Sequence, residues 1–584
     1  MRVVATAGHV NHGKSALVTA LTGQDPDRLP EERRRGLTVD LGHADTLLPD
    51  GEQLAIVDVP GHRRFLGNTL CGVATAPAVL FVVAADGGWQ AQSFEHLAAV
   101  RAFGIRHGVL AVTRADLADP AETLVEAGDR LADAGLTFPG VAVSARSGQG
   151  LDMLRDTLAE VTAAIPTPPT DEPVRLWIDR AFTLPGPGTV VTGTLTAGRL
   201  HRGMTVTVAP GGQATTVRGL QCTGREVTEV AAPARVAVNL RRVAPADVGR
   251  GRALLSTDRW RCTDTVDIAV AAEDPLPREV IIHCGTAMTS ARTRRLDGEL
   301  YRLRLAGALP LRHGDRLLVR DTGRGGLLSA RVWDIDPAAL RRRGAAAAWA
   351  RWLRATPGPA DLVRRRGAVH RAALIAAGGE IAEDALRHGD WLVDPGHAER
   401  LAARVRVETQ RRFEASPPEP GLSVTEAARL TGVVPDLVPL LVSVAGLELR
   451  SGRVVDPRRV LPARVAAVVA AVTGELAGAT FAAPTARRLR ELGATVELLM
   501  AAVRAGALWH GGGSVYLAPD APDRAAGLLP TGINLTVGDC CRLWSTTRRV
   551  AVPLLEHLDA RGLTRRDPDG RRVVTASASG AGSR

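Results

Sequence analysis

The chain has few cysteines and almost no lysine, and each shortage carries information. Six of the 584 residues are cysteine and no two form a C-x-x-C pair, so neither a disulfide framework nor a tetrahedral zinc site is expected. Scattered thiols suit a reducing cytosol, which predicts a cytoplasmic protein. Lysine and arginine total 73, and only Lys14 is a lysine. A coding bias explains why arginine replaces lysine almost everywhere. The lysine kept at position 14 indicates that arginine could not replace it there.

Long apolar runs are also missing. The longest, such as residues 78–85 and 465–472, are far shorter than the roughly 18 to 20 residues that span a bilayer, so no membrane span is expected. A glycine-rich motif begins at Gly8, which leaves no room for a leader, and we expect the mature chain to start at Met1. With 45% hydrophobic and 23% charged residues, the chain should fold, and its length favours three to six domains.

Charge is unevenly placed along the chain. The net charge of +11 divides into −6 over residues 1–170, +6 over residues 171–340 and +11 over residues 341–584. A basic half suits a nucleic-acid partner, and a solvated arginine face explains it equally well. Charge alone therefore leaves the partner open.

The first part of the chain, residues 1–170, is predicted to be an α/β domain. Short β-branched runs, such as residues 54–57 and 79–83, alternate with helical stretches, which is typical of a parallel sheet covered by helices. Residues 165–173 contain four prolines, which can continue neither a helix nor a central strand. We expect a linker there.

The composition changes twice beyond this linker. Residues 174–256 and 257–338 alternate short strands with glycine turns, which predicts two small β-barrels. Residues 341–584 form alanine- and leucine-rich helices, and each group of helices ends in a glycine-turned strand pair. This pattern predicts four tandem winged-helix units, the last at about residues 523–577. One irregular helical domain is the alternative for this tail.

The octapeptide GHVNHGKS near the N-terminus has the spacing of a phosphate-binding loop. It follows a β-branched run and precedes a helical pattern, which is the context that such a loop requires. Its glycines let backbone N–H groups turn towards a phosphate, and the lysine ammonium is compact enough to reach the β- and γ-phosphates. Arginine's planar fork would not fit this cradle. The loop residues predicted to bind nucleotide are Gly8, His9, Val10, Asn11, His12, Gly13, Lys14 and Ser15.

Three further motifs follow in the order that a P-loop GTPase needs. DVPGH (58–62) ends a strand with a carboxylate for Mg²⁺ and a glycine amide for the γ-phosphate. TRAD (113–116) ends another strand with an aspartate that can accept two hydrogen bonds from guanine. SAR (144–146) ends the last strand of the domain. Ligands of doubly wound sheets bind at the carboxyl ends of the strands, so the remaining GTP-binding residues are predicted to be Asp58, Gly61, Thr113, Arg114, Asp116, Ser144, Ala145 and Arg146.

The segment ERRRGLTVDLG (32–42) lies where a mobile switch belongs, between the phosphate-binding loop and DVPGH. Its Thr38 is predicted to bind Mg²⁺ together with Ser15, and with Asp58 through water. A solvated basic turn is the alternative for this run.

With these motifs in place, residues 1–340 resemble a translational GTPase of the elongation factor Tu type, with one GTPase domain and two barrels. RGLTVDLG, DVPGH, IDRAF (178–182) and GPGTVVTG (186–193) resemble more narrowly the selenocysteine-specific elongation factor (SelB) family. The resemblance implies GTP and Mg²⁺ as cofactors and His62 as the catalytic residue that places the attacking water, with Val10 and Leu37 as an apolar gate. It also implies a monomer that delivers selenocysteyl-tRNA to the ribosome at UGA codons.

The same resemblance implies an amino-acid pocket made by Asp179, Arg180 and Arg235. A selenol ionises more readily than a serine hydroxyl or a cysteine thiol. Two guanidiniums oriented by one carboxylate can therefore select the charged selenolate over neutral competitors. Without the resemblance, Asp179 and Arg180 would be an ordinary pair on a barrel surface.

In the tail, the resemblance implies that the last winged helix binds a hairpin of selenoprotein messenger RNA. Arginine pairs at a helix start and on a wing can grasp phosphates and stack on a looped-out base. The residues predicted for this contact are Arg548, Arg549, Arg565 and Arg566.

Some residues depart from the family pattern. Asn11 replaces the usual aspartate, Arg63 follows His62 where glutamate is common, and Thr113 with Arg114 replaces an Asn-Lys or Thr-Lys pair. We expect altered nucleotide affinity rather than a lost site. Pro553 should kink or shorten its helix, at a cost of about 3 kcal/mol in a helix interior.

Two other functions remain open from the sequence. One is a general elongation or initiation GTPase, which the basic tail and Arg180 with Arg235 disfavour. The other is a winged-helix DNA-binding regulator with a nucleotide sensor, which would need a palindromic duplex site. The two predicted barrels disfavour the second.

Overall fold

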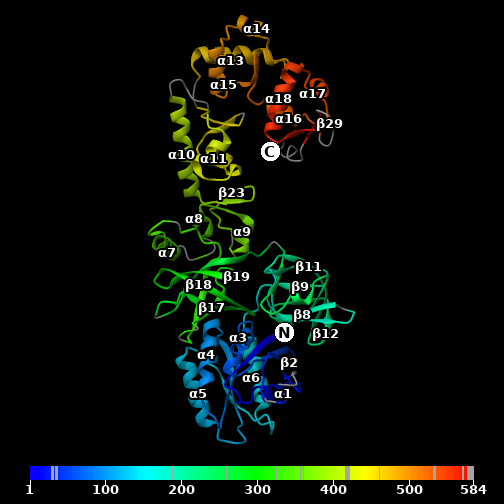
Figure 1. Ribbon diagram of the computed structural model, residues 1–584, viewed down its shortest axis with the longest axis vertical. Helices are drawn as coiled ribbons and strands as arrows, with labels where there is room; N and C mark the ends of the chain where they lie inside the picture. The colour runs from blue at the N-terminus through cyan, green and yellow to red at the C-terminus, as the bar shows by residue number, and fades with distance from the viewer. Residues whose placement is uncertain are drawn as a thin grey trace. The chain divides into compact units, whose positions relative to one another are not determined.

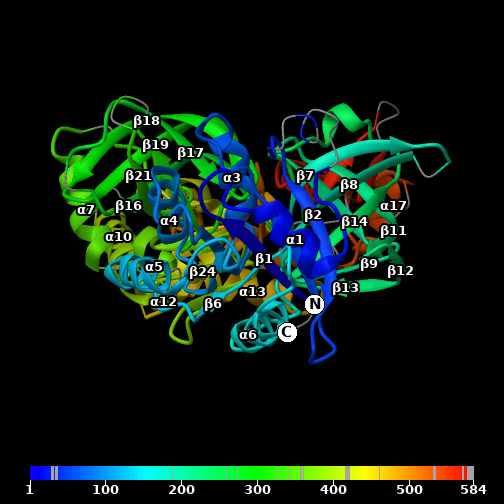
Figure 2. The same cartoon turned by 90° about the horizontal axis from the view of Figure 1, so that it is seen from below.

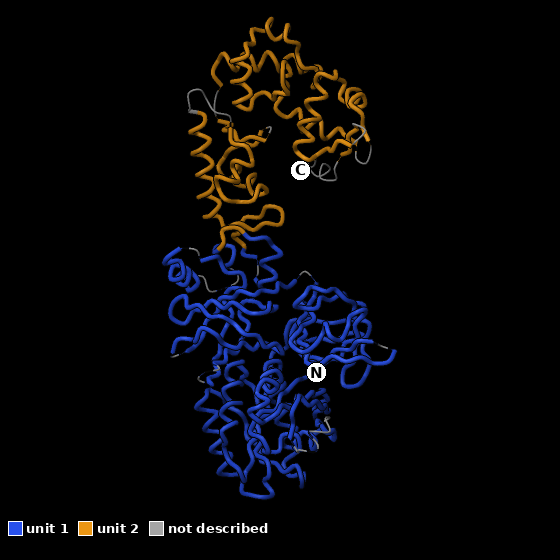
Figure 3. Tube along the Cα trace, in the orientation of Figure 1, with its two compact units in different colours: residues 1–365, 369–382 blue, residues 366–368, 383–584 orange. Residues whose placement is uncertain are grey.

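A computed structural model shows a multidomain chain that divides into two compact units (Figure 3). One unit holds residues 1–365 and 369–382, and the other holds residues 366–368 and 383–584. The structure describes all residues except 28–31, 33, 35–36, 187, 258, 273, 322, 324, 341, 356–357, 359–360, 380, 415–420, 451, 459–460, 531–533, 568–570 and 575–584.

A six-stranded sheet of order β2-β3-β1-β4-β5-β6 forms the centre of the N-terminal domain. All neighbouring strands in it run parallel except β2, which is antiparallel to β3. Its strands are β1 (Arg2–Ala7), β2 (Gly42–Leu47), β3 (Gln53–Asp58), β4 (Ala78–Ala84), β5 (His107–Thr113) and β6 (Gly140–Ala142). Because β1 and β4 are buried along nearly their whole length, both faces of this sheet must be covered.

Helices cover the two faces separately. The helices are α1 (Lys14–Thr22), α3 (Leu66–Val73), α4 (Ala91–Phe103), α5 (Ala121–Asp133) and α6 (Leu151–Ala163), and the 3-10 turn η1 spans Arg63–Phe65. Alternate residues of β1 separate the two cores: Val3 packs with α3, α4 and α5, whereas Val4 packs with α1 and α6. The carboxyl ends of the parallel strands therefore meet at one edge of the sheet.

Two closed six-stranded barrels follow (Figure 1). The first closes in the order β10-β15-β7-β8-β14-β11. Its segments are β7 (Arg175–Leu184), β8 (Gly188–Ala197), β9 (Arg199–His201), β10 (Thr205–Ala209), β11 (Gln213–Cys222), β12 (Arg225–Val227), β13 (Glu229–Ala231), β14 (Ala234–Leu240), η2 (Pro245–Asp247) and β15 (Ala253–Ser256). The second closes in the order β16-β19-β18-β17-β20-β21. Its strands are β16 (Cys262–Val270), β17 (Glu279–Cys284), β18 (Ala287–Asp297), β19 (Leu300–Pro310), β20 (Arg316–Arg320) and β21 (Leu327–Asp334).

Beyond the barrels the chain alternates short helices with strand pairs, as predicted. The first elements are α7 (Ala345–Ala355), α8 (Leu362–Arg366), β22 (Ala368–His370), α9 (Arg371–Ala376), β23 (Leu386–His388) and β24 (Trp391–Val393). The next group is α10 (Pro395–Glu414), α11 (Val424–Thr431), η3 (Pro435–Leu437), α12 (Val438–Val444), β25 (Glu448–Arg450) and β26 (Arg453–Val455).

Two more groups complete the tail. The third is α13 (Ala463–Leu476), α14 (Ala486–Glu491), α15 (Val496–Arg504), β27 (Trp509–Gly512) and β28 (Val515–Leu517). The fourth is α16 (Ala521–Gly527), β29 (Asn534–Leu535), α17 (Val537–Leu543), α18 (Arg548–Ala560), β30 (Thr564–Arg566) and β31 (Arg572–Val574). The fold class predicted from the sequence is confirmed: a P-loop α/β domain, two barrels and a helical region with a winged-helix domain.

The structure adds two features to this prediction. Helix α7 packs on the second barrel, because the Trp349 indole N–H donates to Asp267 at 2.6 Å and Leu353 shares a core with Leu300. Helix α18 runs unbroken through Pro553, so the expected shortening is wrong. Proline removes only the N–H that would reach the carbonyl of residue 549, in the first turn of the helix.

Among the residues that the structure describes, no single helix has both the length and the hydropathy to cross a membrane. A pair of helices, Val424–Thr431 and Pro435–Val444, passes that test jointly and is bent by 98°.

Candidate nucleotide site and barrel pocket

The phosphate-binding loop connects β1 to α1 and has a backbone that requires glycine. Gly8 has a φ of 130°, and a Cβ atom there would lie 2.1 Å from the Val82 carbonyl oxygen. Lys14 is buried, and its ammonium donates to the carbonyls of Gly8 and His9 at 3.1 and 2.9 Å. Burial lowers the pKa of Lys14 to about 8. The Lys14 ammonium is therefore a buried cation that lies against the loop backbone. A phosphate bound by the loop would stabilise its charge.

Three oxygen-bearing side chains meet beside this loop, as the motifs predict. The Ser15 hydroxyl donates to Asp58 at 2.6 Å and lies 2.8 Å from the Thr38 hydroxyl. Thr6 donates to the other Asp58 oxygen at 2.7 Å, and burial raises the pKa of this carboxyl. Thr38 also donates to Asp27 at 2.9 Å, a partner that the motifs did not indicate. Hard oxygen donors of this kind suit Mg²⁺, so the residues present fit the metal.

The DVPGH motif lies directly against the loop. A Cβ atom on Gly61 would lie 2.5 Å from the Lys14 ammonium and 2.6 Å from the Val10 amide nitrogen, so only glycine allows this approach. His62 follows at the start of η1, half-buried, and its Nδ1 accepts a hydrogen bond from the Arg64 amide at 3.2 Å. The predicted catalytic residue therefore adjoins the predicted phosphate site.

The guanine motifs are joined to the loop through Thr113 and Arg114. The Thr113 hydroxyl donates to the His12 carbonyl at 2.7 Å. Arg114, with a φ of 58°, pairs with Asp86 at 2.8 Å and donates to the Asn11 carbonyl at 2.5 Å. Both departures from the family pattern thus keep this segment tied to the loop.

The last strand brings the third motif to the same edge of the sheet. The Ala115 amide donates to the Val143 carbonyl at 3.1 Å. Asp116 is exposed, Ser144 is buried, and Ala145 and Arg146 become progressively more exposed. The structure therefore brings the predicted GTP-binding residues together at the carboxyl ends of β1, β3, β5 and β6.

Sequence reasoning missed two residues of α4 that hold the loop. The Gly8 amide donates to His96 Nδ1 at 3.0 Å, and the Val10 amide donates to Gln92 Oε1 at 3.0 Å. Burial lowers the pKa of His96 to about 3, so the ring stays neutral and accepts. An i, i+4 polar pair on a helix that faces the core was the available signal.

The predicted amino-acid residues belong to β7 and β14 of the first barrel, two strands that are drawn near β2 in Figure 2. Asp179 accepts from both terminal nitrogens of Arg235, at 2.5 and 3.1 Å, and from the Thr192 hydroxyl at 2.9 Å. The same Arg235 lies 2.8 Å from His43 Nε2. A cavity beside this cluster is lined by His43, Thr192 and Arg235 together with Gln221. Asp179 and Arg235 are thus together, as predicted.

Arg180 faces elsewhere. It donates to the Leu41 carbonyl at 3.1 Å and lies 3.9 Å from the Asp40 carboxylate. The pairing of β7 with β8 shifts register between Ile178 and Arg180, and a bulge of this kind re-aims consecutive side chains. Arg180 therefore contacts the switch segment instead of the Asp179–Arg235 pair.

The four tail arginines do not form one group. Arg548, Arg565 and Arg566 are exposed. Arg549 donates to the Ser514 carbonyl and hydroxyl at 3.2 and 3.1 Å, and also to the carbonyls of residues 483 and 484. Its guanidinium therefore holds the third group of tail elements to the fourth, and sequence spacing gave no sign of this.

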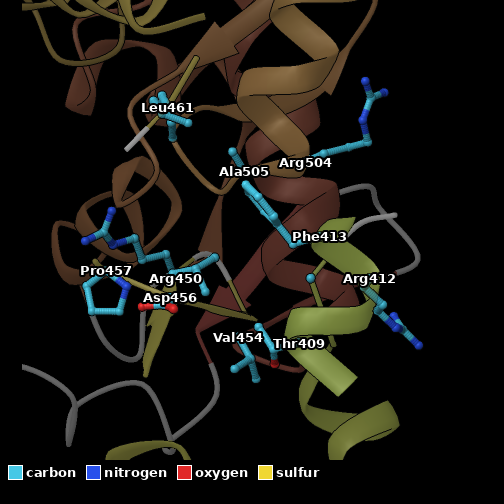
Figure 4. Close-up of a pocket in the computed structure, with 13 residues that line it drawn as sticks. Thr409, Arg412, Phe413, Arg450, Val454, Asp456, Pro457, Leu461, Arg504 and Ala505 are labelled. Atoms are coloured by element: carbon cyan, nitrogen blue, oxygen red, sulfur yellow. The ribbon is translucent and has the colours of Figure 1, made fainter. Parts of the chain in front are cut away.

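A separate hollow in the tail is rich in arginine (Figure 4). Arg450 in its wall pairs with Glu448 at 2.7 Å, and Arg412 pairs with Glu408 and Glu426 at 3.1 and 3.0 Å. Two of the three arginines in the wall are thus compensated from within the chain, whereas Arg504 makes no described ion pair and its Nε is buried without a hydrogen-bond partner.

Two family models match the chain. Residues 1–164 match the elongation factor Tu GTP-binding domain, and residues 534–573 match the elongation factor SelB winged helix.

Selenocysteine-specific elongation factors are among the curated relatives of the chain. The one from Desulfomicrobium baculatum is 37% identical over 340 residues, which is 54% of this chain and 53% of the relative. The one from Escherichia coli (strain K12) is 35% identical over 345 residues, 57% of this chain and 56% of the relative. The chain spans about half the length of the curated relatives it matches.

Solved structures extend the likeness to the tail. A bacterial selenocysteine-specific elongation factor EF-Sec has a TM-score of 0.75 at 25% identity, over 98% of this chain and 100% of that one. The Methanococcus maripaludis elongation factor SelB, in complex with the GTP analogue GppNHp, has a TM-score of 0.50 at 22% identity. The match covers 57% of this chain and 79% of that one. The second likeness shows the fold alone. These comparisons favour neither a general elongation or initiation factor nor a DNA-binding regulator.

Proposed function

Because the chain is a SelB-family translational GTPase, we propose that it binds selenocysteyl-tRNA with GTP and delivers it to the ribosome at UGA codons. A hairpin in selenoprotein messenger RNA directs this delivery to the correct codon, and GTP hydrolysis makes it irreversible. The observation that carries the proposal is the Asp179–Arg235 pair, whose arginine lines a cavity in a barrel attached to the P-loop domain. We further propose that the chain acts as a cytoplasmic monomer.

At the nucleotide site, each segment has one task. The loop amides and Lys14 hold the β- and γ-phosphates, and Asp116 accepts from the N1–H and the amine of guanine. Ser15, Thr38 and, through water, Asp58 would hold Mg²⁺, which would supply positive charge to neutralise charge that develops on the phosphates. His62 positions the water that attacks the γ-phosphate, and its place beside Gly61 supports this role.

In the barrel pocket, recognition depends on charge. At neutral pH the selenol is ionised, whereas serine and cysteine remain largely neutral. The Arg235 guanidinium, fixed by Asp179, offers the selenolate a preorganised cation in a partly buried site, where electrostatic attraction exceeds that at the surface. Arg180 adds a second cation once it leaves Leu41 and Asp40.

The test is protection of aminoacyl-tRNA from hydrolysis in the presence of GTP. We expect protection of selenocysteyl-tRNA, and little protection of seryl- or cysteinyl-tRNA. Arg180→Ala and Arg235→Ala should each weaken selenocysteyl-tRNA binding and leave the weak seryl-tRNA binding unchanged. Arg199→Ala is the matched control, because Arg199 lies in the same barrel and pairs only with Glu229 among its described polar contacts. Equal protection of all three tRNAs would indicate a general elongation factor.

For the tail, we propose that Arg548, Arg565 and Arg566 contact the messenger RNA hairpin. The match of residues 534–573 to the SelB winged helix and the exposure of these side chains support this assignment. Affinity for a hairpin from the host's own selenoprotein message should fall as salt rises, because phosphate contacts supply much of it. Binding to a DNA duplex in preference to this hairpin would favour the regulator instead.

A further inference from the structure

Three arginines of the first barrel hold the end of the switch segment. Arg180 contacts Leu41 and Asp40, Arg235 contacts His43, and Arg250 contacts Asp40. The segment they hold begins two residues after Thr38, whose hydroxyl lies beside Ser15 at the predicted metal position. A short, continuous stretch of chain therefore connects the metal position to the barrel pocket.

Arg250 has the widest reach of the three. Its Nη2 pairs with Asp40 at 2.5 Å, its Nη1 donates to the Asn68 side chain at 2.8 Å, and its Nε donates to the Asp179 main-chain carbonyl at 3.0 Å. Asn68 in turn donates to the Val39 carbonyl at 2.8 Å. One guanidinium thus joins the switch segment, the helix after DVPGH and the strand that carries the pocket.

We propose that Arg250 and Asp40 form a latch that positions Thr38 at the metal site and so couples the bound nucleotide to the barrel. Arg250 is a positioning residue here, since it acts on the site through Asp40 and Asn68. With the latch closed, Thr38 is available to Mg²⁺ and the γ-phosphate of GTP. GDP has no γ-phosphate to hold Thr38, so the latch contributes little to its binding.

The coupling is reciprocal, because linkage requires that two ligands change each other's affinity by the same factor. The Arg250 bond to the Asp179 carbonyl places the pocket strand under the same control. This part rests on the proposed function: opening the latch should reduce the GTP dependence of selenocysteyl-tRNA binding.

The first experiment needs no tRNA. Dissociation constants for GDP and for a non-hydrolysable GTP analogue are measured with Mg²⁺ on the full chain carrying Arg250→Ala, Asp40→Asn, or both. We expect about tenfold weaker binding of the GTP analogue in each single variant, unchanged binding of GDP, and a double variant no worse than either single one. Arg250→Lys should recover only part of the loss, because an ammonium cannot span all three partners.

Arg252→Ala is the matched control, because this neighbour donates to the Pro210 carbonyl and makes no described polar contact with the switch segment. Equal weakening of GDP and GTP analogue would show a purely structural role and overturn the latch. Additive losses in the double variant would overturn the pairing of Arg250 with Asp40.

The second experiment separates this inference from the proposed function. Selenocysteyl-tRNA protection is compared with GDP and with the GTP analogue, in the unmodified chain and in Arg250→Ala. The quantity compared is the ratio of protection with the GTP analogue to protection with GDP. A smaller ratio in Arg250→Ala than in the unmodified chain supports the coupling, and an unchanged ratio overturns it. If the unmodified chain protects no selenocysteyl-tRNA, the proposed function fails, whereas the nucleotide measurements still decide the latch.

Discussion

Phe481→Ala should destabilise the fourth group of tail elements although Phe481 belongs to the third. The Phe481 ring is 6% exposed and lies 6.0 Å, between ring centroids, from Trp544, which is 2% exposed. One hydrophobic core runs from Val465 to Val574 and includes both rings. Removing a buried phenylalanine ring costs about 3–5 kcal/mol, and this loss should fall on residues 461–574 as one unit.

The chain offers its own probes for this prediction. A fragment of residues 461–574 contains two tryptophans, Trp509 in β27 and Trp544 after α17. Variants that keep only one tryptophan, with phenylalanine at the other position, report each group separately during urea unfolding. We expect both probes to give the same midpoint, and Phe481→Ala to lower both midpoints together.

Val496→Ala is the control, because Val496 is 69% exposed in the third group and should change stability by no more than about 0.5 kcal/mol. Two separate midpoints, or a Phe481→Ala effect confined to Trp509, would refute the shared core. The fourth group would then be an independent domain.

Three other substitutions test the remaining parts. Asp116→Asn should shift nucleotide preference from guanine towards xanthine, and equal competition by ATP and GTP in the unmodified chain would contradict this assignment. His62→Ala should leave GTP binding nearly intact and lower ribosome-stimulated hydrolysis by roughly 10²-fold or more, so equal turnover on ribosomes would exclude that role. Burial and the nearby Arg320 lower the pKa of His283 to about 4 in the second barrel. Because the unfolded chain takes up this proton near pH 6.5, stability should fall by up to about 3 kcal/mol between pH 6.5 and 4; amide exchange in β17 should show this loss, and His283→Leu should remove it.

The sequence predicted the layers well, and it indicated that the motifs of the proposed nucleotide site meet at one edge of the sheet, because both signals are local. Each P-loop motif fixes its own turn at the end of its own strand, and the parallel sheet brings those ends together. Gly8 and Gly61 are examples of such local signals. Glycine is required at both positions, because the close backbone contacts there exclude any side chain. Strand periodicity likewise defined both barrels without any knowledge of their partners.

Contacts between distant segments were beyond the sequence. Arg250 reaches Asn68 across 182 positions, and Arg549 reaches Ser514 across 35. Nothing in the local pattern separates either one from an exposed surface arginine, in a chain where nearly every basic residue is arginine. Trp349 is a similar case, because helical periodicity predicted its helix and gave no indication that the indole would bond to Asp267.

Arg548 and Arg549 allow the proposed RNA contact to be separated from tail stability. Arg549→Ala leaves the carbonyls of residues 483, 484 and 514 without this donor. Hydrogen bonds to a charged group contribute about 1.5–3 kcal/mol, and solvent reduces this at an exposed site to about 1–2 kcal/mol. Arg548 makes no described side-chain hydrogen bond or ion pair, so Arg548→Ala should leave stability nearly unchanged.

We therefore expect Arg549→Ala to lower the unfolding midpoint of residues 461–574, and Arg548→Ala to weaken hairpin binding with a smaller salt slope. The reverse result, with Arg549→Ala fully stable and defective in hairpin binding, would show that its contacts with the third group give way to RNA.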